Sequence, residues 1–216
     1  MSSLTLMRAS ALYYAYGHTP VLSGIDLEIP PGRVTAIAGT NGAGKTTLVE
    51  ILAGVRIPDS GVVDRRATVV LVVQRPHVPD ELPLTAGDVV ALGAQSPAAR
   101  QQRGQGRRAR TAAVAAALDR VGASELCPIP FADLSGGQRQ RVLIAQGLAV
   151  GARILLLDEP AAGLDADSRA RTREILAEEA RRGVAVACVT HDRDDLESAD
   201  RVLWIEDGAA RLGVNG

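Results

Sequence analysis

The chain has 216 residues, a formal net charge of −1 and two cysteines, and 46% of its residues are hydrophobic. This length suits one domain, or one domain with a subdomain, and the apolar content is ample for a core. The near-zero charge excludes a global attraction to nucleic acid or to an anionic membrane, and two distant cysteines exclude a disulfide framework. Because the sequence shows no signal-like segment and no membrane-length apolar run, we expect a cytosolic chain whose membrane parts, if any, belong to another protein.

The first 30 residues are expected to form short strands with a turn at "YGHTP". Three of the chain's five aromatic residues lie here, as Tyr13, Tyr14 and Tyr16. Strand alternation would place Tyr14 and Tyr16 on one face and Tyr13 on the other, and Gly17 would end the strand directly after Tyr16. We interpret this segment as an antiparallel hairpin layer that packs against a main sheet.

Runs that are apolar at every position follow, and such runs are typical of parallel strands buried on both faces. These runs begin at Val34, Thr68, Ile154, Val184 and Arg201. Helical stretches lie between several of them, for example "ADSRARTREILAEEARRG" at residues 166–183. The alternation of strand and helix predicts an α/β fold.

The middle of the chain, roughly residues 75–150, departs from this pattern and is interpreted as a mostly helical insertion. Within it, residues 95–111 are polar and carry five arginines and two glycines, which we interpret as an exposed loop. A nucleic-acid-binding arm is the alternative. Since no aromatic residues lie among the arginines, no nucleic-acid partner is expected.

The segment "GTNGAGKTT" matches the phosphate-binding loop G-x-x-x-x-G-K-[ST] and lies between an expected strand and an expected helix. Glycines allow the backbone to approach an anion, and the loop amides and the helix dipole bind phosphate. Lys45 adds a full charge at the β- and γ-phosphates, Thr46 offers a hydroxyl to Mg²⁺, and Thr47 reinforces phosphate binding. The expected nucleotide-binding residues of this loop are Gly39, Asn41, Gly42, Ala43, Gly44, Lys45, Thr46 and Thr47.

The segment "ILLLDEP" supplies the carboxylates that such a loop needs. Asp158 follows four apolar strand residues and is expected to hold Mg²⁺, while Glu159 is placed to accept a proton from attacking water. A polar strand exit without function is the alternative for this pair. Together with the phosphate loop, the pair favours nucleotide hydrolysis.

A second anion site is expected at "LSGGQRQRV", where Ser135 can cap a helix that begins at Gly136. An ordinary capped helix would explain the serine but not the following Gly136, Gly137 and Gln138. Two phosphate sites and one catalytic carboxylate suggest that each nucleotide lies between the first site of one subunit and the second site of another.

With these motifs in this order, the whole chain resembles the ATPase subunits of ATP-binding cassette (ABC) transporters. The resemblance implies a P-loop NTPase core with an N-terminal antiparallel β layer and a helical subdomain. We expect one ABC ATPase domain over residues 1–216, with the core in 1–74 and 151–216 and the helical subdomain, which carries the signature motif, at about 75–150. It also implies ATP and Mg²⁺ as cofactors and a head-to-tail homodimer that encloses two ATP molecules.

The family's remaining elements match single residues of this chain. Gln74 matches the glutamine that senses Mg²⁺ and the γ-phosphate, and His191 matches the switch histidine, so both join Glu159 as expected catalytic residues. Tyr16 matches the aromatic residue that stacks on adenine, with Tyr13 or Tyr14 as alternatives. The loop that crosses the dimer interface in the family matches Gly163, Leu164 and Asp165.

The stretch "QRPHVPDELPLTAGDVVALG" resembles zinc and manganese uptake cassettes in the part that faces the transport partner. The resemblance implies a subunit on the inner face of the cell membrane that powers uptake of zinc, or of manganese, through a permease and an extracytoplasmic substrate-binding protein. The three histidines are scattered, so the chain itself is not expected to bind the transported metal. An exporter of a drug, lipid or haem precursor and a soluble non-transport cassette remain as alternatives.

Overall fold

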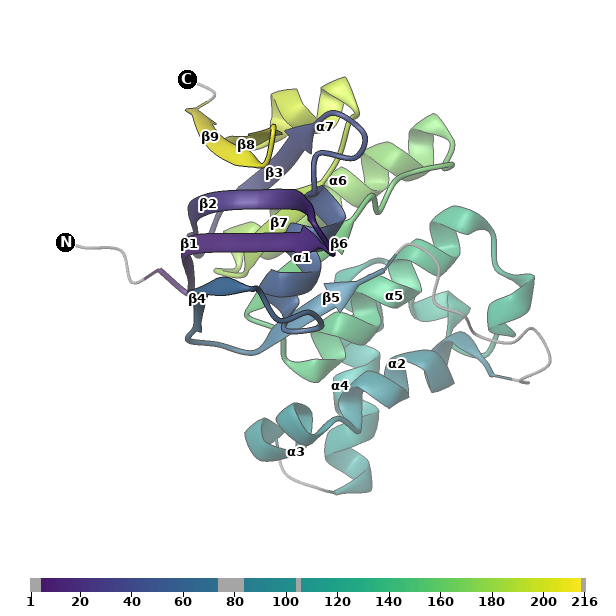
Figure 1. Cartoon of the computed structure of the whole chain (residues 1–216). Coiled ribbons are helices and arrows are strands. Elements are labelled where there is room, and N and C mark those ends of the chain that lie inside the picture. The colour runs from purple at the N-terminus through teal and green to yellow at the C-terminus, as the bar shows by residue number, and fades with distance from the viewer. Residues whose placement is uncertain (1–4, 74–83, 104–105, 215–216) are drawn as a thin grey trace. The chain divides into compact units, whose positions relative to one another are not determined.

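Two long strands, β1 (Met7–Tyr16) and β2 (Thr19–Ile29), form the N-terminal hairpin of the computed structural model, which describes residues 5–73, 84–103 and 106–214 (Figure 1). They pair antiparallel, and β4 (Ser60–Arg65) completes a three-stranded sheet in the order β2-β1-β4. The expected hairpin layer is thus confirmed, but its strands are longer than expected. A bulge at Ala11, with φ of 49° and a backbone N–H that donates to Asp26, lets β1 continue through an irregular register.

The chain divides into two units, and this hairpin belongs to unit 1, which is built from described residues within 1–71, 153–160 and 176–216. The main sheet has the strand order β5-β6-β7-β3-β8-β9. Its strands are β3 (Val34–Gly39), β5 (Val69–Val72), β6 (Ile154–Asp158), β7 (Ala185–Val189), β8 (Arg201–Glu206) and β9 (Ala209–Val214). Strands β6, β7, β3 and β8 pair in parallel, as the buried apolar runs predict, whereas β9 pairs antiparallel with β8.

The core of unit 1 lies between the β layer, the main sheet and helix α1 (Lys45–Ala53). Leu12 and Ile25 of the hairpin, Leu48 of α1 and Ile37 of β3 are fully or almost fully buried in one hydrophobic cluster. This cluster fixes α1 against the sheet by the burial of apolar surface. A short helix, α7 (Arg193–Ser198), follows β7 in the same unit. The core therefore holds the end of β3 and the start of α1 in a defined place.

Unit 2 contains described residues within 72–152 and 161–175 and is mainly helical. Its helices are α2 (Ala86–Ala94), α3 (Pro97–Arg103), α4 (Arg107–Arg120) and α5 (Gly136–Val150), with 3₁₀ turns at Ser124–Leu126 and Phe131–Asp133. Helix α6 (Ala166–Arg181) begins in unit 2, and its residues from Leu176 onward belong to unit 1. Helices α2 and α5 approach closely, since a Cβ on Gly93 would lie 2.2 Å from the carbonyl oxygen of Gln146.

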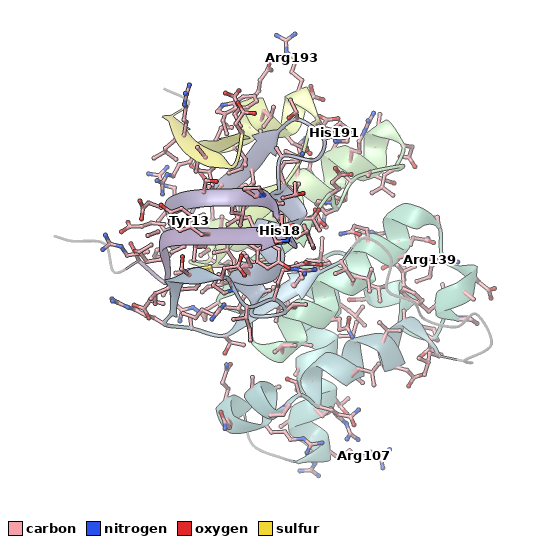
Figure 2. All side chains as sticks on the ribbon, in the orientation of Figure 1. Tyr13, His18, Arg107, Arg139, His191 and Arg193 are labelled. Atoms are coloured by element: carbon pink, nitrogen blue, oxygen red, sulfur yellow. The ribbon has the colours of Figure 1, made fainter. Side chains whose placement is uncertain are left out.

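Most of the described residues in the arginine-rich segment are helical, so the expectation of a loop at residues 95–111 was wrong for them, while residues 104–105 lie outside the described residues. Its described residues form α3 and the first part of α4, and Ser96 caps α3 by accepting a hydrogen bond from the N–H of Ala99. The physical reason is that alanine, arginine and glutamine are among the best helix formers. Arg100, Arg107, Arg108 and Arg110 are exposed, and Arg107 projects outward at the start of α4 (Figure 2).

Within the ranges that the structure describes, no helix has the length and apolar character needed to cross a bilayer.

Candidate nucleotide-binding site

The loop between β3 and α1 is built around glycines that other residues could not replace without strain. Gly42 and Gly44 have φ values of 83° and 94°, in the left-handed region that residues with a Cβ rarely adopt. A Cβ on Gly39 would lie only 2.2 Å from the carbonyl oxygen of Ile205 on β8. Because Gly44 is the N-cap of α1, the free amides of the first turn and the positive end of the helix dipole face this loop. This geometry suits a phosphate group.

Lys45 is the only lysine of the chain, and its side chain lies over the loop. Its Nζ donates hydrogen bonds to the carbonyl oxygens of Gly39, at 3.0 Å, and Thr40, at 2.9 Å, and the residue is buried. The ammonium group is thus held beside the amides that face an anion. A positive charge at this point favours the same ligand as the helix dipole does.

Asp158, at the end of β6, has a carboxylate that is not fully satisfied by the protein. Among the residues that the structure describes, its Oδ1 is buried without a hydrogen-bond partner. Burial raises the pKa of Asp158, and the neighbouring Glu159 and Glu50 add to this rise, whereas the hydroxyl of Thr46 and the ammonium of Lys45 lower the pKa. A buried carboxylate oxygen beside a threonine hydroxyl fits the oxygen ligands that Mg²⁺ prefers.

Glu159 follows directly and has an unusual backbone. Its φ is 47°, in the left-handed region, and its N–H donates to the carbonyl oxygen of Val189 on β7, at 3.1 Å. Its Oε1 lies 3.6 Å from Nδ1 of His191, whose side chain is 71% exposed (Figure 2). Strained non-glycine conformations persist where the surrounding structure enforces them, and they gather at functional sites. The structure therefore brings these two expected catalytic residues together.

The residues on either side of His191, Thr190 and Asp192, are held by hydrogen bonds. The hydroxyl of Thr190 donates to Asp195, at 2.7 Å, and accepts from the N–H of Asp192, at 3.1 Å. Asp192 in turn caps α7 by accepting from the N–H groups of Asp194 and Asp195. The backbone on the C-terminal side of His191 is thereby held while the imidazole stays accessible.

Tyr16 is the aromatic residue that contacts the phosphate loop. Its hydroxyl lies 3.2 Å from Oγ1 of Thr47, and the residue is 49% exposed. Tyr14 packs edge-on against it, with ring centroids 5.1 Å apart, so these two tyrosines share a face as predicted. Tyr13 instead covers Gly24, because a Cβ on that glycine would lie 3.0 Å from the Tyr13 hydroxyl.

The signature segment lies in unit 2, at the start of α5. Ser135 is the N-cap, as predicted, and its hydroxyl accepts from the N–H of Gln138, at 3.3 Å. The hydrogen bonding is reciprocal, because Oε1 of Gln138 accepts from the N–H of Ser135, at 2.9 Å. This capping box gives Gln138 a structural role, so the expectation that helix capping would not explain the glutamine was wrong.

The two signature glycines are packed against the segment that contains the expected interface loop. A Cβ on Gly137 would lie 2.2 Å from Oγ of Ser168, and a Cβ on Gly136 would lie 3.1 Å from Cδ2 of Leu164. Asp165 accepts hydrogen bonds from the N–H and the hydroxyl of Ser168, at 2.8 and 3.1 Å. The pKa of Asp165 is lowered, first by the backbone N–H of Ser168 and then by its hydroxyl. Gly163, with φ of 76°, begins the turn that leads into this segment.

Two further points concern metal binding. Gln74, the expected metal- and phosphate-sensing residue, lies outside the described residues. Across residues 5–73, 84–103 and 106–214, no group of three or more histidine, cysteine, aspartate or glutamate side chains forms a site for a metal ion.

The sequence interpretation did not single out Ser168, Glu50 or Arg56. Ser168 could have been found, because a serine three residues after Asp165 is typical of local side-chain to backbone contacts at a helix start. Glu50 and Arg56 could not, because their role depends on a contact with the hairpin that no local pattern signals. Arg56 hydrogen-bonds both Glu50 and the hydroxyl of Tyr14.

The sequence is similar to those of known proteins. The family described as ABC transporter matches residues 22–162. The zinc import ATP-binding protein ZnuC of Cereibacter sphaeroides is 38% identical over 206 residues, which cover 94% of this chain and 79% of that protein. The aliphatic sulfonates import ATP-binding protein SsuB 2 of Xanthomonas axonopodis pv. citri is 38% identical over 211 residues, covering 96% and 70%. The manganese transport system ATP-binding protein MntB of Bacillus subtilis is 35% identical over 199 residues, covering 88% and 78%.

A solved structure agrees with these relatives. The structure of cbiO1 from Clostridium perfringens, part of the ABC transporter complex cbiONQ, superimposes with a TM-score of 0.83 at 29% identity, covering 97% of this chain and 88% of that one. The expected P-loop NTPase fold is confirmed. The chain therefore belongs to the ABC transporter family and is one of its ATPases.

Proposed function

We propose that this chain hydrolyses MgATP to power an importer of a divalent metal ion, with zinc as the first candidate and manganese as the second. The observation that carries the proposal is the similarity, over nearly the whole chain, to zinc and manganese import ATP-binding proteins. The expected partners are an integral-membrane permease and an extracytoplasmic substrate-binding protein. Through the permease the chain would lie on the inner face of the cell membrane.

The phosphate loop would bind the β- and γ-phosphates through its backbone amides and through Lys45. Tyr16 would stack on the adenine, because it alone of the three tyrosines makes a described contact with the loop, at Thr47. Asp158 and Thr46 would hold Mg²⁺, together with Gln74. The bound ion would supply positive charge that offsets the negative charge of the phosphates.

Glu159 would accept the proton of the attacking water, because it directly follows Asp158, whose carboxyl group interacts with Thr46 and Lys45 of the phosphate loop. The left-handed backbone of Glu159, which is hydrogen-bonded to Val189, would fix the direction of the side chain. His191, whose Nδ1 is 3.6 Å from that carboxylate, would contact the γ-phosphate from the exposed side. A general base contributes about 10²–10⁴-fold to a rate.

The signature residues would complete the site of a second copy of the chain. The start of α5 presents backbone amides and a helix dipole, which are again suited to phosphate. In this arrangement two ATP molecules lie in a head-to-tail homodimer, each between the phosphate loop of one copy and the signature of the other. The loop at Gly163, Leu164 and Asp165 would cross the interface.

Import of a sulfonate is the alternative to metal import, because a sulfonate import ATP-binding protein is as similar to the chain as the zinc import protein is. An exporter is less favoured, since the relatives named above for zinc and sulfonates are import proteins. The cargo is handled by the permease and the binding protein, so the described residues of this chain need no cargo site.

Growth of a deletion strain separates these candidates. The strain is grown in chelator-treated medium with zinc or manganese added back, and separately with a sulfonate as the only sulfur source. We expect a growth defect that zinc alone relieves and that the wild-type gene complements. A defect only on the sulfonate would establish sulfonate import instead. No defect in either medium, with redundant importers deleted, would rule out import of these substrates.

A further inference from the structure

Arg56 occupies a place between the phosphate-loop helix and the tyrosines of the hairpin. Its Nε donates to Oε2 of Glu50 on α1, and its Nη1 donates to the hydroxyl of Tyr14 on β1, both at 2.8 Å. Its backbone N–H also donates to the carbonyl oxygen of Glu50, at 3.2 Å. The guanidinium is therefore fixed to two elements that flank the expected nucleotide.

The same guanidinium lies over the ring of Tyr16. Its central carbon is 5.1 Å from the centroid of Tyr16 and 5.3 Å from that of Tyr14, and the two ring centroids are 5.1 Å apart. A cation within about 6 Å of a ring centroid is attracted by the negative charge of the ring face. Because the three separations are nearly equal, the guanidinium and the two tyrosine rings form one compact cluster.

Tyr16 nevertheless remains 49% exposed, so part of its surface is accessible to a ligand. The ring is held at three points, by Arg56 over it, by the edge contact with Tyr14 and by the hydroxyl contact with Thr47. An aromatic side chain that is fixed before binding loses less conformational entropy when a ligand stacks on it. A cation behind the ring also withdraws electron density from it, which favours stacking of an electron-rich purine on the opposite face.

We propose that Arg56 is a positioning residue for the nucleotide base: it fixes and polarises Tyr16, on whose free face the adenine stacks. The proposal rests on the proposed role of Tyr16. The guanidinium stays charged wherever the protein is folded, since the pKa of Arg56 is raised by its hydrogen bonds to Glu50 and Tyr14. Arg56 thus sets the affinity for the base-carrying nucleotide and leaves the chemistry at the phosphates to other residues.

A purely structural ion pair is the competing explanation, and the choice of ligand separates the two. Binding of ATP and of inorganic tripolyphosphate, which lacks a base, is measured by titration with Mg²⁺ for the wild type and for Arg56→Gln. We expect the Kd for ATP to rise about two- to fivefold, the range of an exposed cation–π contact, while that for tripolyphosphate stays unchanged. In hydrolysis assays the change is expected in KM rather than in kcat.

Three further variants complete the design. Arg66→Gln is the matched control, because Arg66 forms its ion pair with Asp64 of β4, and this variant should bind both ligands as the wild type does. Arg56→Lys keeps the charge but not the paired hydrogen bonds, so an intermediate Kd is expected. Tyr14→Phe removes only the hydroxyl that holds the guanidinium and replaces Arg56→Gln as the test if that variant fails to fold.

Tyr16→Ala distinguishes failure of this inference from failure of the base site. It should weaken ATP binding more than Arg56→Gln, and Arg56→Gln should add nothing in that background. Wild-type ATP affinity in Arg56→Gln, with weakened binding in Tyr16→Ala, would overturn the role of Arg56 alone. An equal loss of tripolyphosphate affinity would also overturn it. Wild-type ATP affinity in Tyr16→Ala would overturn both the stacking site and the inference.

Discussion

Oε1 of Glu159 lies 3.6 Å from Nδ1 of His191, although the two residues are on separate strand ends 32 positions apart in the chain. The N–H of Glu159 donates to Val189, two residues before His191, so one backbone hydrogen bond ties the two strand ends together. The expected base and the expected γ-phosphate contact are therefore positioned by the same pair of parallel strands. The imidazole nitrogen therefore lies close to the carboxylate oxygen but beyond direct hydrogen-bond distance.

Glu159→Gln is expected to lower ATP hydrolysis by about 10²–10⁴-fold, because only the proton acceptor is lost. ATP binding should persist, and the variant should accumulate as a dimer in the presence of ATP. Phosphate release and size-exclusion chromatography measure these two effects. Glu197→Gln, which removes an exposed partner of Arg193, is the control. A wild-type rate in Glu159→Gln would show that another group is the base.

Lys45→Ala is expected to raise the Kd for ATP about tenfold to a hundredfold, since hydrogen bonds to charged groups contribute about 1.5–3 kcal/mol. Titration calorimetry measures the change. Because Lys45 is the only lysine, an amine-reactive acylating reagent labels only this residue and the N-terminus, and ATP should protect Lys45 from it. Unchanged affinity in Lys45→Ala, or labelling that ATP does not reduce, would remove Lys45 from the phosphate site.

Asp158→Asn is expected to stabilise the nucleotide-free protein while it abolishes Mg²⁺-dependent hydrolysis. Burial raises the pKa of Asp158 above 3.8, so the folded state holds the proton more tightly than the unfolded state does. Stability from this group is full below the unfolded pKa and is lost as the pH rises through the folded pKa. An asparagine side chain does not ionise, so the variant avoids this loss of stability. Its melting temperature should therefore exceed that of the wild type at neutral pH.

The pH dependence provides the control for Asp158→Asn. The gain in melting temperature should disappear below about pH 3.8, where the wild-type carboxyl is protonated in both states. A variant that is less stable than the wild type at neutral pH would show that the carboxylate is satisfied within the protein. In that case the unpartnered oxygen would no longer support a metal ligand.

Gly137→Ala is expected to destabilise unit 2 by about 1–3 kcal/mol, because its Cβ would overlap the Ser168 side chain. Without this contact the change would stabilise the helix, since alanine is a better helix former than glycine by about 1 kcal/mol. Gly136→Ala is the matched control, because its Cβ meets only a flexible Leu164 methyl group. Chemical denaturation measures the differences.

Ser168→Gly supplies the complementary test of the Gly137 contact. It removes both Oγ and Cβ of Ser168, so Gly137→Ala should be tolerated in that background. Ser168→Ala should not rescue it, because the Cβ atom of Ser168 lies only 2.7 Å from the new Cβ. Equal stability of Gly137→Ala and Gly136→Ala in the wild-type background would refute the packing explanation.

Much of this fold was predictable because its strands and turns are encoded locally. The continuous apolar runs at "VTAIAG" and "ILLLDEP" form β3 and β6 as predicted, and the glycine pattern before Lys45 defines the strand-to-helix turn. The capping role of Gln138 could also have been predicted, since Ser-x-x-Gln is a capping-box pattern. The intervening Gly136 and Gly137 were instead interpreted as a sign of phosphate binding.

Other features could not be predicted because competing signals concealed them. Glycines and charge suggested a loop at residues 95–111, whereas the helix propensity of alanine and arginine prevails in α3 and at the start of α4. Strands β4 and β9 lack a continuous apolar run, because each lies at the edge of a sheet and exposes much of its surface. The place of Arg56 depends on a tertiary contact between its loop and β1, so only the structure reveals it.

Uptake of radioactive zinc by the deletion strain tests the central claim most directly. The strain carries either the wild-type gene, Glu159→Gln or an empty vector, with expression of both proteins checked. Hydrolysis-driven zinc import predicts uptake with the wild type alone, and competition by unlabelled zinc. Equal uptake with Glu159→Gln and the wild type would contradict hydrolysis at Glu159 as the driving step, and no difference between the wild type and the vector would contradict zinc import.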